Sequence, residues 1–515
     1  VVREGDDLGW LGYFIGWSKQ LKSLYIDNFP DNLNIDAFLR GLGRNRSIEN
    51  LGIYTDLGES YQRLVPFLKN NKSLSDLTFT IYDIGLQCAR NIAVLLGQQS
   101  SLKCLNFEEI NLGDEVFVEI ATALSAQPQI EELNLNTSNI GRNGCVALGN
   151  ALDGMRNPNL ATLYLDHNDI DDEGLHALVG GLINCHNLTK LCLSGNWMIT
   201  EAGLRSLSTL FQSDHCRLER LDLDGFNIDN DGAAELAAGL GSLPRLKSLY
   251  LANNSIGDQG LQSLVGGMVN CNLEQLILST NLCSLSGHRS LGTLVQRATS
   301  LKSLNLCGNT INDEGLECLV DGIVNCCSLT DLDLSDNHLI TAVGLRSIAP
   351  FFQSNNCCLK VLWLFGINFG DDGAAALANG LIGNESLIDL KFDLSGITAR
   401  GWAAFSRLLC DTASVNSTYL SNHTLETIGG FGMQEDTPPD ILKYLTLNKF
   451  GAAAIFKILK NHPDIDIEPL FQWKLKCLPL VVTWLESARS YRGNVNESTG
   501  TFQCRQLSAL YKFVR

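Results

Sequence analysis

One spacing pattern constrains this chain more than any other feature. The motif L-x-x-L-x-L, with Ile allowed at its first position and Ile or Phe at its sixth, recurs every 26 to 30 residues. Fourteen copies begin at Leu21, Ile48, Leu74, Leu102, Ile130, Leu160, Leu188, Leu218, Leu246, Leu273, Leu301, Leu329, Leu359 and Leu387, and a degenerate fifteenth is expected to begin at Val415. Units of this length bury their apolar faces by stacking on neighbours, so the pattern predicts a solenoid.

The first half of each repeat predicts a strand and a turn, as residues 160–187 illustrate. Leu160, Leu163 and Leu165 alternate with other residues, which predicts a short parallel strand with these side chains buried. Asn168 follows at a turn, where its amide can bond the backbone of neighbouring coils. Other repeats place an Asn at the equivalent turn position: Asn196, Asn254, Asn281, Asn309 and Asn337.

The second half of the repeat predicts a helix. Asp172 and Glu173 favour a helix N-terminus, and Gly174 is expected to supply backbone freedom there. Apolar residues then recur at helical spacing, namely Leu175, Leu178, Val179 and Leu182. One strand and one helix per repeat predict an α/β leucine-rich-repeat horseshoe, with a concave parallel β-sheet and α-helices on the convex side.

The repeat resembles the ribonuclease-inhibitor-like subfamily of leucine-rich-repeat proteins. The resemblance rests on L-x-x-L-x-L-x-x-N, the period of about 28 residues and the outer helix, and it covers roughly residues 21–430. That subfamily includes nuclease inhibitors, activators of the Ran GTPase and sensor regions of innate-immune receptors, so the resemblance implies the fold and leaves several functions open.

The two ends of the chain depart from the repeat. Residues 1–20 are expected to be the helical half of a partial repeat, with about 15 repeats over 21–430 and a linker at 431–439. Residues 440–515 are expected to form a helical cap that docks on the last repeats. The segment HPDIDIEPLFQWKLKCLPLVVTWLE is similar to the tail of diatom leucine-rich-repeat proteins of unassigned activity. Both ends are consistent with truncation of a longer chain.

The acidic charge of the chain narrows its choice of partners. Residues 436–515 hold 11 Lys and Arg against 7 Asp and Glu, so of the net charge of −18 the first 435 residues carry −22. Such a surface repels phosphate, which disfavours general binding of nucleic acid or anionic membranes and favours a basic protein partner. The charge alternatively serves only solubility. No apolar run is long enough to span a bilayer.

Seventeen cysteines are many for a reducing compartment, but their placement favours one. Their number is odd, and several recur just before a strand, as Cys185, Cys216 and Cys271 do, which fits buried thiols rather than a disulfide framework. The chain is therefore expected to be cytoplasmic, or alternatively nuclear. Nine Asn-x-Ser/Thr sequons leave secretion open.

No enzyme signature is present, and neither a catalytic residue nor a cofactor site is predicted. The chain lacks P-loop, HExxH, GxSxG, CxxC and dinucleotide-binding motifs. The densest potential metal ligands lie at one corner of two successive repeats: Cys185, His186, Asp214, His215 and Cys216. The following corners carry cysteines without further histidines, so structural thiols are favoured and no metal is predicted.

The concave face is the candidate binding surface. In each strand the fifth and seventh motif positions should face outward, which exposes a mixture of aromatic, aliphatic and acidic side chains of the kind that forms binding hot spots. The predicted partner-binding residues are Tyr164, Asp166, Asp222, Asp224, Tyr250, Ile277, Asp333, Trp363 and Phe365. Asp222 should adjoin Tyr250, and Tyr250 should adjoin Ile277.

Non-catalytic recognition of a basic protein is the leading functional hypothesis. The resemblance also implies two alternatives, a GTPase activator of the Ran-activator type and a ribonuclease inhibitor. An activator needs positioned polar or Arg residues near the nucleotide, and no motif places them in this chain. The negative charge would suit basic ribonucleases. Oligomeric state remains open.

Overall fold

The computed structural model describes residues 8–27, 36–54, 71–80, 84–97, 101–156, 158–324, 326–430, 437–449 and 453–462. Two compact units make up the chain: unit 1 comprises residues 1–310 and unit 2 comprises residues 311–515.

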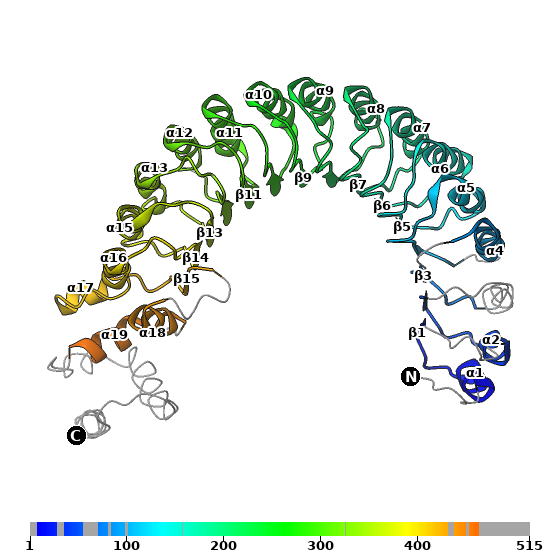
Figure 1. Cartoon of the computed structure of the whole chain (residues 1–515), viewed down its shortest axis with the longest axis horizontal. Coiled ribbons are helices and arrows are strands. Elements are labelled where there is room, and N and C mark those ends of the chain that lie inside the picture. The colour runs from blue at the N-terminus through cyan, green and yellow to red at the C-terminus, as the bar shows by residue number, and fades with distance from the viewer. Residues whose placement is uncertain are drawn as a thin grey trace. The chain divides into compact units, whose positions relative to one another are not determined.

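Unit 1 alternates short strands with helices, and its strands lie on the inner side of the arc that the unit forms (Figure 1). Its strands are parallel and neighbour one another in sequence order: β1 (Ser23–Ile26), β2 (Asn50–Ile53), β3 (Asp76–Phe79), β4 (Cys104–Asn106), β5 (Glu132–Asn134), β6 (Thr162–Tyr164), β7 (Lys190–Cys192), β8 (Arg220–Asp222), β9 (Ser248–Tyr250), β10 (Gln275–Ile277) and β11 (Ser303–Asn305). The predicted parallel sheet is confirmed for this unit.

The helices of unit 1 lie along the outer side of the same arc (Figure 1). They are α1 (Leu8–Trp17), α2 (Asp36–Leu42), α4 (Leu86–Leu96), α5 (Gly113–Leu124), α6 (Arg142–Gly154), α7 (Asp172–Leu182), α8 (Glu201–Phe211), α9 (Asn230–Leu240), α10 (Asp258–Gly267), the short 3-10 helix η2 (Met268–Asn270) and α11 (Leu285–Arg297). Leu160, Leu163 and Leu165 are buried, as predicted, and pack into a core shared by successive coils.

Unit 2 continues the alternation and then adds helices. It contains α12 (Asp313–Ile323), β12 (Asp331–Asp333), α13 (Ala342–Ser347), α14 (Ala349–Phe352), β13 (Val361–Leu364), α15 (Gly370–Gly380), β14 (Asp389–Phe392), α16 (Ala399–Leu409), α17 (Val415–Tyr419), β15 (Thr427–Ile428), α18 (Pro439–Asn448) and α19 (Ala453–Asn461).

The expectation of a strand at Val415 is wrong. Residues 415–419 form helix α17, and the last strand begins twelve residues later, at Thr427. Ser414 explains the difference, because its hydroxyl accepts a hydrogen bond from the Ser417 amide and caps a helix N-terminus. The motif V-x-x-T-x-L therefore forms a helix here, because the cap by Ser414 competes with the strand.

The turn asparagines hold successive coils together, as predicted. Asn196 is fully buried, and its Nδ2 donates to the carbonyls of Leu165, 2.9 Å away, and Leu193, 2.5 Å away. Its Oδ1 accepts from the Ile170 amide at 3.2 Å. One side chain thus satisfies backbone groups of two coils that the turn would otherwise leave unpaired.

A second set of hydrogen bonds joins the helix N-termini, and it corrects the role predicted for Gly174, whose equivalent in the next coil is Gly203. The Asp172 carboxylate, at the start of α7, accepts hydrogen bonds from the Thr200 and Gly203 amides at the start of α8, at 2.8 and 2.9 Å. Gly203 does not have a positive φ, and a Cβ on it would lie 2.6 Å from that carboxylate. Glycine is needed there for space, and not for the backbone freedom that was expected. At Gly174 a Cβ would lie 3.1 Å from the Arg142 backbone, so close packing again accounts for the residue.

The same arrangement recurs where the preceding coil has Asp or Asn at the position equivalent to Asp172. The capping residues and the helices whose N-termini they cap are Asp114 for α6, Asp172 for α8, Asn230 for α10 and Asp258 for α11 in unit 1, and Asp313 for α13 and Asp371 for α16 in unit 2. Where the preceding helix begins with Arg142 or Glu201, the next helix is capped from within its own coil, by Asp171 or Asp229.

Replacing Asp172 by Ala should destabilise helix α8, which belongs to the next coil. Loss of the cap is expected to cost about 1–2 kcal/mol. Native-state hydrogen exchange should show faster exchange at Ala202, Gly203 and Leu204. Glu173→Ala is the matched control, because Glu173 is exposed and forms only a surface ion pair with Arg142. Equal effects of the two substitutions would contradict the cross-coil cap.

Helices α18 and α19 contact the end of the repeats within unit 2. Ile441 and Leu445 of α18 are buried. Asn448 Nδ2 donates to the Leu425 carbonyl at 2.6 Å, and the buried Lys457 ammonium donates to the Leu409 and Asn422 carbonyls at 2.5 and 2.8 Å. Residues 439–449 and 453–461 thus contact the last repeats, while 450–452 and 463–515 of the expected cap lie outside the described residues.

The first expected partial repeat contains helix α1, while residues 1–7 lie outside the described residues. In the described part of the chain, no helix has both the length and the apolar character that crossing a membrane requires.

Candidate binding surface

Parallel pairing brings the predicted residues of unit 1 into one row. The register aligns Tyr164, Cys192, Asp222, Tyr250 and Ile277 across β6 to β10. The central leucine of each of these strands points the other way and is buried. The predicted neighbours Asp222 and Tyr250, and Tyr250 and Ile277, are therefore adjacent. We call the surface formed by the following residues the tyrosine–aspartate patch: Tyr164, Asp166, Lys190, Ser194, Arg220, Asp222, Asp224, Tyr250 and Ile277.

Asp222 occupies the middle of the patch but is less accessible than expected. Only 8% of its surface is exposed. Its carboxylate accepts a hydrogen bond from the Ser194 hydroxyl and another from an Arg220 terminal nitrogen at 3.2 Å. Asp222 therefore orders its neighbours and contributes negative charge, whereas the adjacent carboxylates offer more contact area. Cys192, beside it in the row, is buried as well.

Asp166 and Asp224 lie near Asp222, just beyond the aligned row. Asp224 follows Asp222 by two residues, and Asp166 follows Tyr164 by two residues. Each accepts a backbone hydrogen bond from the following coil, Asp166 from Ser194 at 2.8 Å and Asp224 from Ala252 at 2.5 Å. Burial, followed by the charge of Asp222, raises the pKa of both carboxyls to about 6. Both groups are charged at neutral pH and lose their charge in mildly acidic solution.

Two cations complete the patch. Lys190 Nζ lies 4.3 Å from the centre of the Tyr164 ring and 2.7 Å from its hydroxyl oxygen. The Arg220 guanidinium lies 4.1 Å from the centre of the Tyr250 ring, and a terminal nitrogen donates to the Tyr250 hydroxyl at 3.1 Å. These cation–π contacts fix both tyrosines on the strand-lined face.

The two cations were missed because they occupy the third motif position. In a strand, residues at positions three, five and seven share a face, whereas the prediction covered only positions five and seven. Lys190 and Arg220 are the third residues of their motifs, so the period of two could have identified them.

Unit 2 holds the remaining predicted residues in a separate group. Pairing of β12, β13 and β14 aligns Asp333, Trp363 and Lys391. The Trp363 and Phe365 side chains are half-buried, and Asp333 accepts from the Ser335 amide at 2.9 Å. Aromatic and charged side chains are therefore adjacent here too, and the aromatic side chains form the larger part of this group.

A family model described as Leucine Rich repeat matches residues 156–179, 184–208, 243–265, 297–320 and 325–349. The ribonuclease inhibitor of Sus scrofa is 30% identical to the chain over 257 residues, which are 44% of this chain and 55% of the inhibitor. The chain is a leucine-rich-repeat protein whose repeats are similar to those of ribonuclease inhibitors.

Two further relatives show how much of this leucine-rich-repeat chain is similar to known proteins. The ribonuclease inhibitor of Mus musculus is 28% identical over 311 residues, 58% of this chain and 67% of the inhibitor. NACHT, LRR and PYD domains-containing protein 5 of Mus musculus is 30% identical over 220 residues, 39% of this chain and 19% of that protein. The chain thus spans little more than half of the porcine inhibitor and a fifth of the third relative.

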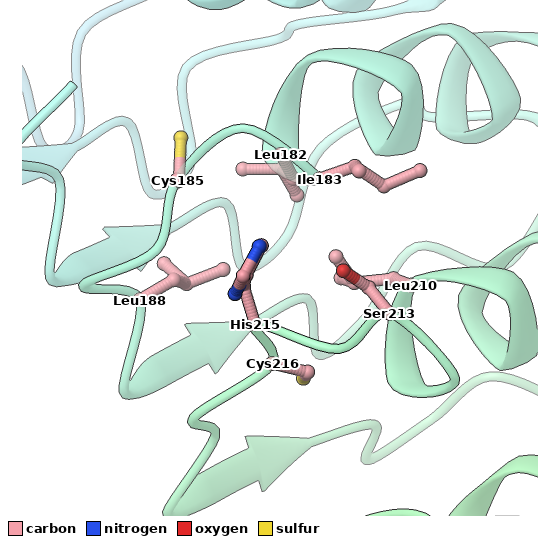
Figure 2. Close-up of a pocket in the computed structure, with 8 residues that line it drawn as sticks. All are labelled: Leu182, Ile183, Cys185, Leu188, Leu210, Ser213, His215 and Cys216. Atoms are coloured by element: carbon pink, nitrogen blue, oxygen red, sulfur yellow. The ribbon is translucent and has the colours of Figure 1, made fainter. Parts of the chain in front are cut away.

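The Cys–His corner of this leucine-rich-repeat chain does not assemble a ligand set. The His186 and His215 rings are 4.3 Å apart, but Figure 2 shows the Cys185 sulfur pointing away from the His215 ring. Burial raises the pKa of the Cys185 thiol to about 12, which keeps it protonated. Among the described residues, no three Cys, His, Asp or Glu side chains lie together as a metal would require.

Proposed function

We propose that the chain is a non-catalytic recognition protein whose tyrosine–aspartate patch binds a basic protein. The observation that carries the proposal is the position of Asp166 and Asp224, two half-buried carboxylates on the strand-lined face. Among the described residues neither carboxylate forms an ion pair with Lys or Arg, whereas Arg220 is already engaged by Asp222 and Tyr250. The patch therefore offers two half-buried negative charges to cations supplied by a partner.

The surrounding residues suit an interface as well. Tyr164 and Tyr250 are held in place by Lys190 and Arg220, so they lose little conformational freedom when a partner packs on them. Rigid tyrosines beside unpaired carboxylates are typical of binding hot spots, where aromatic area supplies affinity and charge supplies orientation. We include Asp333, Trp363 and Phe365 as a second contact surface in unit 2.

Binding of a basic partner is expected to weaken as the pH falls from 7.5 to 5.5. Protonation of Asp166 and Asp224, whose pKa values are about 6, removes the two charges and should reduce affinity by about three- to tenfold. These pKa values lie above the ordinary value of 3.8, so protonation of the two carboxyls stabilises the folded state. A loss of affinity at low pH therefore does not come from unfolding of this site. Titration calorimetry at both pH values, with a partner captured by the purified chain, measures the effect.

Two double variants make this test specific. Asp166→Asn with Asp224→Asn should weaken binding at pH 7.5 and abolish the dependence on pH. Glu115→Gln with Asp153→Asn removes the same amount of charge from exposed positions on the helices. This control should leave the affinity at pH 7.5 and its dependence on pH unchanged. Equal behaviour of the two double variants would place the partner on another surface.

Ribonuclease inhibition is the second candidate, because two relatives carry the name ribonuclease inhibitor. Basic ribonucleases match the negative patch in charge. A pancreatic-type ribonuclease assayed with excess chain should lose activity if this candidate is correct, and the loss should disappear in the Asp166→Asn, Asp224→Asn variant. Full ribonuclease activity at saturating chain removes it. No described contact adds support for activation of a GTPase.

We further propose a cytoplasmic location, with the nucleus as the alternative. The support is the state of the cysteines: all fifteen in the described residues are free thiols. Function without a cofactor or metal remains part of the same proposal.

A further inference from the structure

The coils of this chain follow a higher-order repeat of three. Residues 160–245 and 301–386 match coil by coil, and each block contains a first, a second and a third type of coil. The matching segments are DDEGLHALVGGLINC with NDEGLECLVDGIVNC, GLRSLSTLFQSDHC with GLRSIAPFFQSNNC, and DNDGAAELAAGL with GDDGAAALANGL. Residues 246–300, between the two blocks, contain a first-type and a second-type coil only. The coil that begins at Leu301 therefore follows a second-type coil directly.

The third-type coil differs from the other two at the turn that follows its strand. First-type and second-type coils carry the turn asparagine, whereas the third-type coils carry Phe226 or Ile367 at this position. A third-type coil instead supplies donors to the coil after it. Asn254 Oδ1, in the first-type coil that follows, accepts hydrogen bonds from the Phe226 and Ile228 amides at 3.0 and 2.9 Å. A first-type asparagine is therefore satisfied when a third-type coil precedes it.

Asn309 is the turn asparagine of the first-type coil that lacks this predecessor. It is only 6% exposed, and its Nδ2 donates to the Leu278 and Leu306 carbonyls at 2.9 and 3.1 Å. Among the described residues, its buried Oδ1 accepts no hydrogen bond. The other predicted turn asparagines each accept at least one from the preceding coil, namely Asn168, Asn196, Asn254, Asn281 and Asn337. A buried acceptor without a donor weakens the contact that encloses it.

Two junctions, each between a first-type coil and the coil before it, can be compared directly. We call them the Asn254 junction and the Asn309 junction. Each is crossed by one Lys–Glu ion pair, between Lys247 and Glu219 at 2.6 Å and between Lys302 and Glu274 at 2.7 Å. At each, two amides of the preceding coil donate to carbonyls of the following coil, and these probe amides are Leu223 and Gly225 at the first junction and Leu278 and Thr280 at the second. The unpaired oxygen therefore distinguishes two otherwise similar contacts.

We infer that the Asn309 junction is an opening site built into the array. Coils of a solenoid are held by their neighbours, so the array opens internally where one junction is weaker than the others. Opening would also let water bond the Asn309 oxygen, which the closed state leaves unpaired. It would separate Ile277, at one end of the tyrosine–aspartate patch, from Asn305 across the junction, so that this end of the patch can change shape. The inference concerns residues 273–310 of unit 1 and does not depend on the proposed function.

Native-state hydrogen exchange of the full chain tests the inference. The probe amides of the Asn309 junction should have protection factors at least about tenfold lower than those of the Asn254 junction. An unpaired buried acceptor favours the open state by roughly this factor. Equal or higher protection at the Asn309 junction would overturn the inference.

Alanine substitutions show whether the Asn309 oxygen is truly unpaired. Asn254→Ala removes an acceptor of two backbone amides together with its donors, whereas Asn309→Ala removes only donors. The first substitution should therefore lower the protection of its probe amides at least about tenfold more than the second lowers that of its own. Equal losses would mean that a buried water satisfies the Asn309 oxygen, and would also overturn the inference.

Insertion of a coil supplies the opposite test. A copy of residues 218–245 placed between Ser300 and Leu301 provides the missing third-type coil, whose two donor amides can then bond Asn309 Oδ1. The protection of the Leu278 and Thr280 amides should rise at least about tenfold. The control is the same copy placed directly after residues 218–245 themselves, which lengthens the array and should leave these amides unchanged. A folded chain with the first insertion and no gain in protection would contradict the opening site.

Discussion

Deleting residues 437–515 should make the C-terminal coils of unit 2 unfold first and lower the stability of that unit by several kcal/mol. Helix α18 buries Ile441 and Leu445 against the end of the repeats, and Lys457 and Asn448 satisfy carbonyls there. Removal uncovers apolar surface at about 25 cal/mol per Å² and leaves those carbonyls without their donors. Hydrogen exchange over residues 359–430 should show protection lost from β15 backward.

A point substitution separates the cap from other effects of truncation. Leu445→Ala should destabilise unit 2 by about 2–5 kcal/mol, because the side chain is only 5% exposed. Leu420→Ala, at a side chain that is 59% exposed, should cost less than about 0.5 kcal/mol. Unchanged protection at 359–430 in both the truncated chain and Leu445→Ala would show that α18 and α19 are an independent module.

Replacing Asn196 by Ala should destabilise unit 1 by about 3 kcal/mol, because the substitution leaves buried backbone groups of two coils unpaired. The Leu165 and Leu193 carbonyls lose their donor, and the Ile170 amide loses its acceptor. Urea unfolding monitored by circular dichroism measures the change. Asn187→Ala, at an exposed position of the neighbouring coil boundary, should cost less than about 0.5 kcal/mol. A similar midpoint for the two variants would mean that water replaces the Asn196 amide.

The repeat fold could be predicted because each coil repeats one pattern of burial. Leu160, Leu163 and Leu165 must face inward whatever surrounds them, and Asn168 must satisfy backbone groups at the turn. Prediction failed where the pattern is degenerate. At Val415 a local helix cap by Ser414 outcompetes a weak strand motif, and sequence spacing does not weigh these two energies.

The candidate surface could be predicted only in part, for a related reason. Strand alternation places Asp222, Tyr250 and Ile277 side by side, but it does not reveal how much of each is exposed. The side chains of Ser194 and Arg220 hydrogen-bond to Asp222 and cover it. The directions of these side chains depend on neighbouring coils, which strand alternation does not specify. The role of Gly203 was misjudged likewise, because the carboxylate that fills its space comes from the preceding coil.

The caps that run from one coil to the next have a direction. Asp172 precedes by 28 residues the Thr200 amide that it caps, and the other cross-coil caps follow the same order. During synthesis, therefore, the acceptor leaves the ribosome before the helix start that needs it, and a new coil can be completed on a finished template. Loss of coils from the C-terminal side leaves these side-chain caps in place, whereas opening from the N-terminal side removes the side-chain cap of the next helix. The helix caps of this array are thus polar, and we expect them to form in the direction of translation.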